Sequence, residues 1–161
     1  MAIAGHPIHP VLIPLPIGLL VGSVVADIAY IVTGWDAMWY DIAFWALIGG
    51  VLSALVAAAA GFGDYWLMAR HTDARTMTQT HMVLNLAAVA LFTVSIVLRL
   101  DRGAVDGPRF GAALALSLVA VVMIAVSGWI GGEMSYRKHL GMIPDTVEQR
   151  VDETERHLAH R

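Results

Sequence analysis

Cysteine is absent from the 161 residues of this chain, and charged residues are scarce. Without thiols the protein can form no disulfide, no cysteine-ligated iron–sulfur cluster and no thiolate nucleophile. Charged residues make up 14% of the chain, against about 25% in ordinary soluble domains. Lys and Arg are missing before Arg70, and the net charge is −3. The composition therefore argues against a soluble globular domain and against nucleic acid as a partner.

Several catalytic motifs are missing as well. The chain has no Gly-x-Ser-x-Gly, no phosphate-binding loop and no His-Glu-x-x-His, so hydrolases, nucleotide-dependent enzymes and zinc peptidases lack support. No helix carries two histidines spaced to stack two haems. A metal would have to be bound by His, carboxylate or Met side chains. We expect a redox or binding protein rather than a stand-alone enzyme.

Hydrophobic residues, 58% of the chain, gather in long runs. About 20 apolar residues cross a bilayer. Segments close to this length cover about residues 11–32, 42–68, 81–98 and 110–130. Because hydrocarbon offers no hydrogen-bond partner to the backbone, such runs must be helical, and the short connectors make successive spans antiparallel neighbours. The sequence predicts an all-α fold, an integral membrane four-helix bundle within a transmembrane domain of residues 1–142.

Residues 143–161 form a charged C-terminal tail, which predicts a short soluble helix beginning near Pro144. Its apolar stripe is thin, which indicates a solvated helix or, in the alternative, a docking helix. An even number of spans places both termini on one side of the membrane. More Lys and Arg flank that side than the other, which favours cytoplasmic termini in a multi-pass protein of the cell inner membrane.

All seven histidines fall on the terminus side of the predicted bundle. The carboxyl groups of Asp64 and Glu133 belong to the same end. Ionisable groups in or beside a membrane are costly, and they are therefore candidates for a functional site. His81 opens the third span, where the helix N-terminus disfavours imidazolium and leaves a neutral ring able to coordinate, and Asn85 follows one turn later on the same face. The alternative is a structural polar network that closes the end of the bundle.

The segment His6-Pro7-Ile8-His9-Pro10 has two possible geometries. If His6 caps a helix that starts at Pro7, the two imidazoles lie about 5–6 Å apart and can share a metal or a cofactor edge. In an extended chain they lie about 9 Å apart, which excludes one small metal held by both. The candidate cofactor-binding residues are thus His6, His9, His81 and Asn85, and the candidate metal ligands are His9, His81, Asp64 and Glu133.

Small residues recur every four positions in the second span, at Gly49, Ser53, Ala57 and Gly61. Such a stripe lets another helix approach closely, either within the chain or from a second copy in a homodimer. The stretch 128–132 is similar, and indicates close packing or a place where the helix yields to a bound group. Asp27, late in the first span, is expected to hydrogen-bond the small-residue face of a neighbouring helix, with a proton path through Tyr30 as the alternative.

Several motifs together resemble a known family. The segments HPIHPVLIPLPIGLL, GFGDYW, HMVLN and GWIGGEMSYRKHLGM occur in the order seen in an uncharacterised bacterial membrane family, domain of unknown function 2231. The resemblance spans about residues 5–142. Near its end the family usually reads Tyr-x-x-Gly-Val-Gly-Val, whereas this chain reads YRKHLGM at 136–142. The resemblance implies four spans, and the joining of some members to Rieske-type iron–sulfur domains implies membrane redox chemistry.

These observations lead to two functional hypotheses for a protein embedded in a lipid bilayer. In the first, the His-rich end binds haem b or a transition metal for electron transfer, with His9 and His81 as ligands and a redox protein as partner. In the second, the chain is a non-catalytic structural or accessory subunit of a larger membrane complex, and its histidines satisfy one another.

Overall fold

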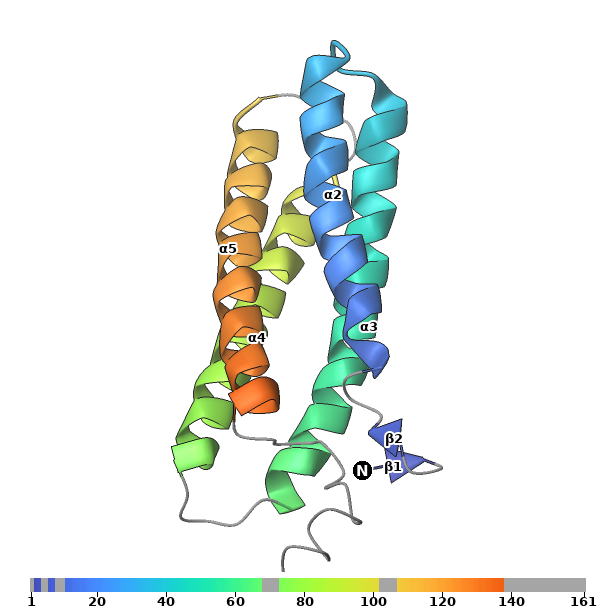
Figure 1. Ribbon diagram of the computed structural model, residues 1–161. Helices are drawn as coiled ribbons and strands as arrows, with labels where there is room; N and C mark the ends of the chain where they lie inside the picture. Colours follow the sequence, from blue (N-terminus) through green and yellow to red (C-terminus); the bar gives the residue numbers. More distant parts are fainter. Residues whose placement is uncertain (1, 4–5, 8–10, 68–72, 102–106, 138–161) are drawn as a thin grey trace, which may run out of the picture.

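The structure is a computed structural model that describes residues 2–3, 6–7, 11–67, 73–101 and 107–137. In this part of the chain the long elements are α2 (Pro14–Val32), α3 (Ala37–Leu67), α4 (Asp73–Leu98) and α5 (Pro108–Arg137). Two short strands, β1 (Ala2–Ile3) and β2 (His6–Pro7), pair antiparallel. The helices stand side by side as an elongated bundle, with the strands beside the lower end of α2 (Figure 1).

Each of the described helices is long and apolar enough to cross a membrane, which confirms the all-helical prediction with four spans. The candidate spans are Pro14–Val32, Ala37–Gly63, Thr76–Leu98 and Pro108–Glu133. Helix α4 begins at Asp73, before the apolar run that starts near His81, because a helix continues into the headgroup region, where polar side chains are tolerated. The helix expected within residues 143–161 lies outside the described residues.

The start of α2 explains how the chain tolerates its prolines. Pro14 is the first helical residue, and Pro16 lies in the same turn. The first N–H groups of a helix have no intrahelical partner, so a proline there removes no hydrogen bond. His6 and Pro7 lie in strand β2, so His6 is not the cap of a helix starting at Pro7, and the extended alternative holds for these two residues. His9 lies outside the described residues.

The connection between α2 and α3 is a tight turn. Gly34 and Trp35 have positive φ angles of 77° and 69°. For Trp35 this left-handed conformation costs about 1–2 kcal/mol. Its ring packs edge-on against that of Tyr30, with centroids 5.1 Å apart, and this contact offsets part of the cost. Asp36 then caps α3, because its Oδ1 accepts a hydrogen bond of 3.0 Å from the backbone N–H of Met38 in the first turn.

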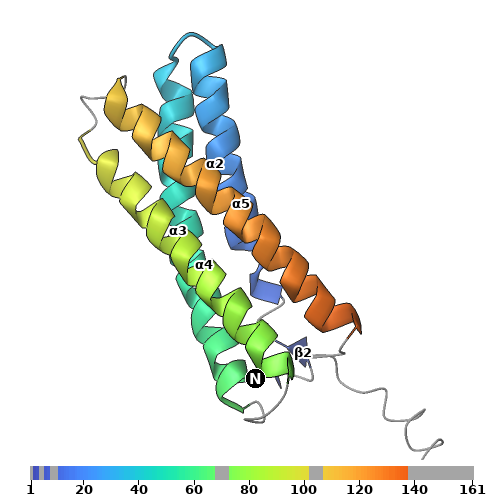
Figure 2. The ribbon, with the colours of Figure 1, turned by 90° about the vertical axis from the view of Figure 1, so that its left-hand side faces the viewer.

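The helices pack as two antiparallel hairpins. Helix α2 lies mainly along α3, and α4 lies mainly along α5, as Figures 1 and 2 show. Gly50 permits the close approach of α2 to α3, because a Cβ at this position would lie 2.6 Å from Leu20 Cδ2. The hairpins meet in the middle through a buried apolar cluster, whose members are Leu20, Leu47, Val51, Ala88, Phe92 and Ala120.

Burial divides the bundle into two halves. The Arg99 half holds the α2–α3 and α4–α5 connections and comprises residues 20–51, 88–101 and 107–120. The His81 half holds the start of α2 and the end of α5 and comprises residues 11–19, 52–67, 73–87 and 121–137. Among the described side chains of the His81 half only those of Pro16, Ala57 and Ser127 are buried, and none is buried between 76 and 87. The firmly packed core therefore lies in the Arg99 half.

Candidate functional site

His81 projects from α4 onto α5 and is half-buried. Its Nδ1 lies 2.8 Å from the carbonyl oxygen of Ser127, and its Nε2 lies 3.0 Å from the amide nitrogen of Asn85. A carbonyl oxygen can only accept a hydrogen bond, so Nδ1 carries the proton. An amide nitrogen can only donate, so Nε2 carries the lone pair. This is the geometry of a neutral imidazole in one fixed tautomer.

Two residues of α5, Ser127 and Gly131, accommodate the His81 ring. The Ser127 hydroxyl donates a hydrogen bond of 3.1 Å to the carbonyl oxygen of His81 and lies 2.9 Å from Nδ1. A Cβ on Gly131 would lie 3.1 Å from His81 Cε1, so glycine makes room for the ring. Helix α5 runs without a break through 128–132. Of the two alternatives for this stretch, close packing therefore holds at Gly131.

The structure describes only some of the other candidate residues. Asn85 lies beside His81, as the spacing of four residues predicts, and Glu133 lies farther along α5 in a half-buried position. The side chains of His6, in β2, and Asp64, in α3, lie outside the described part of the structure, as does all of His9. Among the described side chains, no group of three or more His, Asp or Glu is placed to hold a metal ion.

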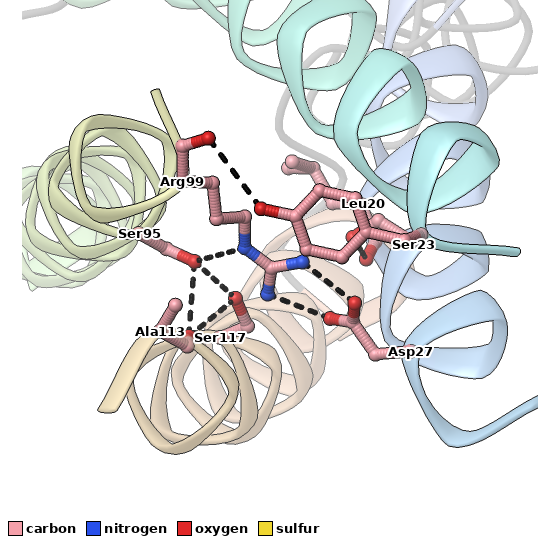
Figure 3. Close-up of polar contacts among 8 residues, drawn as sticks. Leu20, Ser23, Asp27, Ser95, Arg99, Ala113 and Ser117 are labelled. Carbon is pink, nitrogen blue, oxygen red and sulfur yellow. Dashed lines mark hydrogen bonds and ion pairs between the residues drawn. The ribbon is translucent and has the colours of Figure 1, made fainter. Parts of the chain in front are cut away.

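A second polar cluster lies in the Arg99 half, and Figure 3 shows it in close-up. Arg99 follows the last residue of α4, and its guanidinium reaches across to Asp27 on α2. The two groups form a bidentate pair, with N–O distances of 2.6 and 2.7 Å. Their side chains are 1% and 0% exposed. A fully buried ion pair therefore ties one hairpin to the other.

The remaining polar atoms of this cluster are also partnered. Arg99 Nε donates to the hydroxyl of Ser95 at 3.3 Å, and this hydroxyl lies 2.9 Å from that of Ser117. Both serines donate to the carbonyl oxygen of Ala113. The Tyr40 hydroxyl donates to the backbone carbonyl of Arg99 at 3.4 Å. Among the described residues, every buried side-chain nitrogen and oxygen has a hydrogen-bond partner.

This ion pair corrects the sequence-based expectation for Asp27. The carboxylate pairs with Arg99 and not with the small-residue face of a neighbouring helix. The sequence did contain a signal. Asp27 lies shortly before the end of one span and Arg99 directly after the end of another, so the topology places opposite charges at the same depth, where intramembrane charges pair.

The stripe of small residues in α3 packs within the chain at Gly49. A Cβ at Gly49 would lie 3.4 Å from Leu19 Cδ1 on α2. The Ser53 hydroxyl donates back to the carbonyl oxygens of Gly49, at 2.7 Å, and Gly50, at 3.0 Å, and Ala57 is 5% exposed. The intrachain alternative therefore holds at Gly49, while the predicted homodimer stays a prediction.

Four apolar helices of membrane-spanning length, with polar groups buried between them, define a helical integral membrane protein. The chain belongs to the family described as predicted membrane proteins (DUF2231), whose model matches residues 5–144. The resemblance carried by the sequence motifs is thus confirmed. No significant match was found among curated proteins or solved structures.

Proposed function

We propose that the protein binds haem b in its His81 half for electron transfer, with His81 Nε2 as an iron ligand. The observation that carries this proposal is the hydrogen bond from His81 Nδ1 to the Ser127 carbonyl. Histidines that ligate metals almost always donate their other ring N–H to a carbonyl or carboxylate, which fixes the tautomer and the orientation of the ring. His81 has this arrangement.

Haem fits the described residues better than an isolated transition metal ion does. Haem iron needs one or two axial ligands from the protein, because the porphyrin supplies the rest. A bare metal ion would need further protein ligands such as His9 and Asp64, which lie outside the described side chains. A porphyrin also needs apolar surface, and the half-buried side chains of the His81 half, such as Met82, Leu84 and Met123, can supply it. His9 is the proposed second ligand, and a redox protein is the proposed partner.

The second candidate function is that of a structural or accessory subunit of a membrane complex. The observation in its favour is the contact between Asn85 and His81 Nε2. With this contact both ring nitrogens have partners, and the imidazole needs no ligand. His81 would then only tie α4 to α5.

The proposed orientation in the inner membrane places both termini in the cytoplasm. Two of the arginines on the opposite side are paired with acids, Arg99 with Asp27 and Arg109 with Asp101. The positive-inside rule counts Lys and Arg whether or not acids pair with them, and more of these residues flank the terminus side than the opposite side. Because the chain has no cysteine, single cysteines introduced at Met38 and Gln79 would report the sidedness through a membrane-impermeant thiol reagent.

The test is a visible absorption spectrum with metal analysis on protein purified in detergent from cells supplied with haem precursor. We expect a Soret band in the wild type that is lost in His81→Ala and kept in Asn85→Ala, since the second change frees Nε2. Gln79→Ala is the matched control, because Gln79 lies near His81 in sequence and bonds the Tyr65 hydroxyl instead. His9→Ala tests the second ligand.

The alternatives give different results. A Soret band that survives His81→Ala would exclude His81 as the ligand. A stoichiometric metal without a Soret band would indicate that the protein binds a transition metal ion and not haem. A folded protein without colour or metal would favour the accessory subunit, and that function predicts a membrane partner that copurifies with it.

A further inference from the structure

The outward surface of α4 changes from polar to apolar near His81. Within residues 76–98, the exposed side chains before His81 are polar, namely those of Thr76, Gln79 and Thr80. Those after it are apolar apart from Thr93, namely Val83, Leu86, Ala90, Val94 and Val97. The Thr93 hydroxyl donates a hydrogen bond of 2.8 Å to the carbonyl oxygen of Val89, so its polar group is satisfied within the helix. The exposed surface of α4 therefore begins to suit hydrocarbon between Thr80 and Val83.

Helix α5 carries an exposed tryptophan at the same level. Ser127 and Gly131 both lie against His81, and Trp129 lies between them in the sequence. The Trp129 side chain is 80% exposed, so it faces away from the bundle. Tryptophan is enriched where a membrane meets water, because its ring is apolar and its N–H needs a polar partner. Trp129 therefore fits the boundary that the exposed surface of α4 indicates.

Helix α3 has a tyrosine at nearly this level. Gln79 precedes His81 by two residues, or about 3 Å along the helix axis, and donates a hydrogen bond of 2.7 Å to the Tyr65 hydroxyl. This bond is exposed on the outside of the bundle. Tyrosine is enriched at membrane surfaces for the same reason as tryptophan. Three helices thus carry residues suited to the membrane surface at the level of His81.

The distance to the opposite end of the bundle matches the thickness of a bilayer. Arg99 follows His81 by 18 residues, which corresponds to about 27 Å of helix at about 1.5 Å per residue. The hydrocarbon core of a bilayer is about 30 Å thick. Just beyond Arg99, the ion pair of Arg109 and Asp101 has side chains that are 60% and 65% exposed. A boundary at His81 therefore leaves these exposed charges at the opposite boundary, outside the hydrocarbon.

We propose that Gln79, Trp129 and Tyr65 form an interface band, which lies among the headgroups of a phospholipid bilayer, and that the hydrocarbon begins between Thr80 and Val83. The ester carbonyls and phosphates of the lipids accept hydrogen bonds from the indole N–H of Trp129, while its ring lies against the first methylene groups of the acyl chains. The band fixes the depth of the whole bundle, because the helices are long and packed side by side.

This depth places the candidate site at the edge of the membrane. The His81 ring lies at the level of the band, and Asn85, which contacts its Nε2, lies one turn deeper. The band itself does not rest on the proposed function. A haem at Nε2 does rest on it, and the same depth would place the iron within about one helical turn, or about 5 Å, of the headgroup layer. A water-soluble redox protein could then approach it from the aqueous side.

Nitroxide labels on single introduced cysteines measure the depth of each position in the whole protein, in nanodiscs of phosphatidylcholine and phosphatidylglycerol. The chain has no cysteine of its own, so each variant carries one label. Oxygen concentrates in hydrocarbon whereas a polar nickel chelate stays in water, so their relative access to the label reports its depth. The labelled positions of α4 are Thr76, Gln79, Thr80, Val83, Leu86, Ala90 and Val94, all of which are exposed.

We expect the ratio of nickel to oxygen access to fall about tenfold from Gln79 to Ala90, as expected for transfer from water to hydrocarbon, with the two equal between Thr80 and Val83. In α5, Trp129 is compared with Val122, an exposed control about 10 Å deeper. The label at 129 should resemble that at 83, and the label at 122 should resemble that at 90. Phe62 and Leu55, both exposed, give the same comparison in α3.

Two results would overturn the proposal. If nickel and oxygen access become equal at or before Thr76, or at or beyond Leu86, the boundary is at least one turn away from the band. If the labels at 129 and 122 lie at equal depth, Trp129 does not belong to the boundary. The substitutions are at exposed side chains, and helix content shows that each variant folds. The depths are measured without haem, so failure of the band and failure of haem binding are separate results.

Discussion

Removing the carboxylate of Asp27 should be among the most destabilising single changes in the described part of the chain. Asp27→Ala leaves the Arg99 guanidinium in a site where its side chain is 1% exposed; its other partners among the described residues are the hydroxyl of Ser95 and the face of Phe110, 5.7 Å away. Breaking a buried pair by removing one partner costs about 3–5 kcal/mol, because an uncompensated charge stays behind.

The lower end of that range applies here. Arg99 lies one residue beyond α4, at the boundary of the candidate span, so its long side chain can turn toward water after Asp27 is removed. We therefore expect a loss of about 3 kcal/mol. The double variant Asp27→Ala with Arg99→Met removes both charges and keeps apolar volume. It should recover most of this loss, because well-packed apolar residues replace buried ion pairs at little or no cost.

The free energy of unfolding is measured by titrating SDS into dodecyl maltoside micelles, with helix content as the signal. Asp101→Ala is the matched control, since it breaks an arginine–aspartate pair of similar length, 2.9 Å, whose side chains are 60% and 65% exposed. That change should cost less than about 1 kcal/mol. A loss for Asp27→Ala equal to that of the control would refute the reasoning, as would a double variant no more stable than the single one.

The remaining predictions concern glycines and use the same unfolding assay. Gly131→Ala places a Cβ 3.1 Å from His81 Cε1, so the ring must shift and its bonds to α5 weaken, at a cost of about 1 kcal/mol. Gly128→Ala meets no atom within 4 Å and should instead stabilise α5 by about 0.5–1 kcal/mol, so equal signs for the two changes would contradict this account. Gly50→Ala places a Cβ 2.6 Å from Leu20 Cδ2 and should cost about 1–3 kcal/mol. Leu20→Val in the same chain should recover part of that loss, and no recovery would indicate that the clash lies with the backbone.

The spans and the pairing of neighbouring helices could be predicted from the sequence because they depend on length and composition. A run of apolar residues long enough to cross the bilayer must be helical. Short connectors require successive helices to lie antiparallel. The contact between His81 and Asn85 could be predicted in the same way, since four residues along a helix return to the same face. Local geometry determines all of these features.

Contacts between side chains on different helices could not be predicted in this way. A membrane helix is apolar on nearly every side, so its pattern does not reveal which face points inward. The bond from His81 to Ser127 and the pair of Asp27 and Arg99 depend on the rotation of each helix about its axis. Packing fixes that rotation through details such as the contact of Gly50 with Leu20. The sequence therefore indicated that Asp27 and Arg99 lie at the same depth, but not that their side chains meet.

The two polar clusters differ in how readily a ligand could enter them. In the Arg99 half, Asp27 and Arg99 form a buried bidentate ion pair, and separating them costs several kcal/mol. In the His81 half, Nε2 of His81 accepts a hydrogen bond from the neutral amide of Asn85, and a hydrogen bond of this kind contributes about 0.5–1.5 kcal/mol. In the proposed function a bond from Nε2 to iron would replace this contact, and the hydrogen bond to the Ser127 carbonyl would keep the ring in its orientation. Replacing the Asn85 partner of His81 should therefore cost less free energy than separating Asp27 from Arg99.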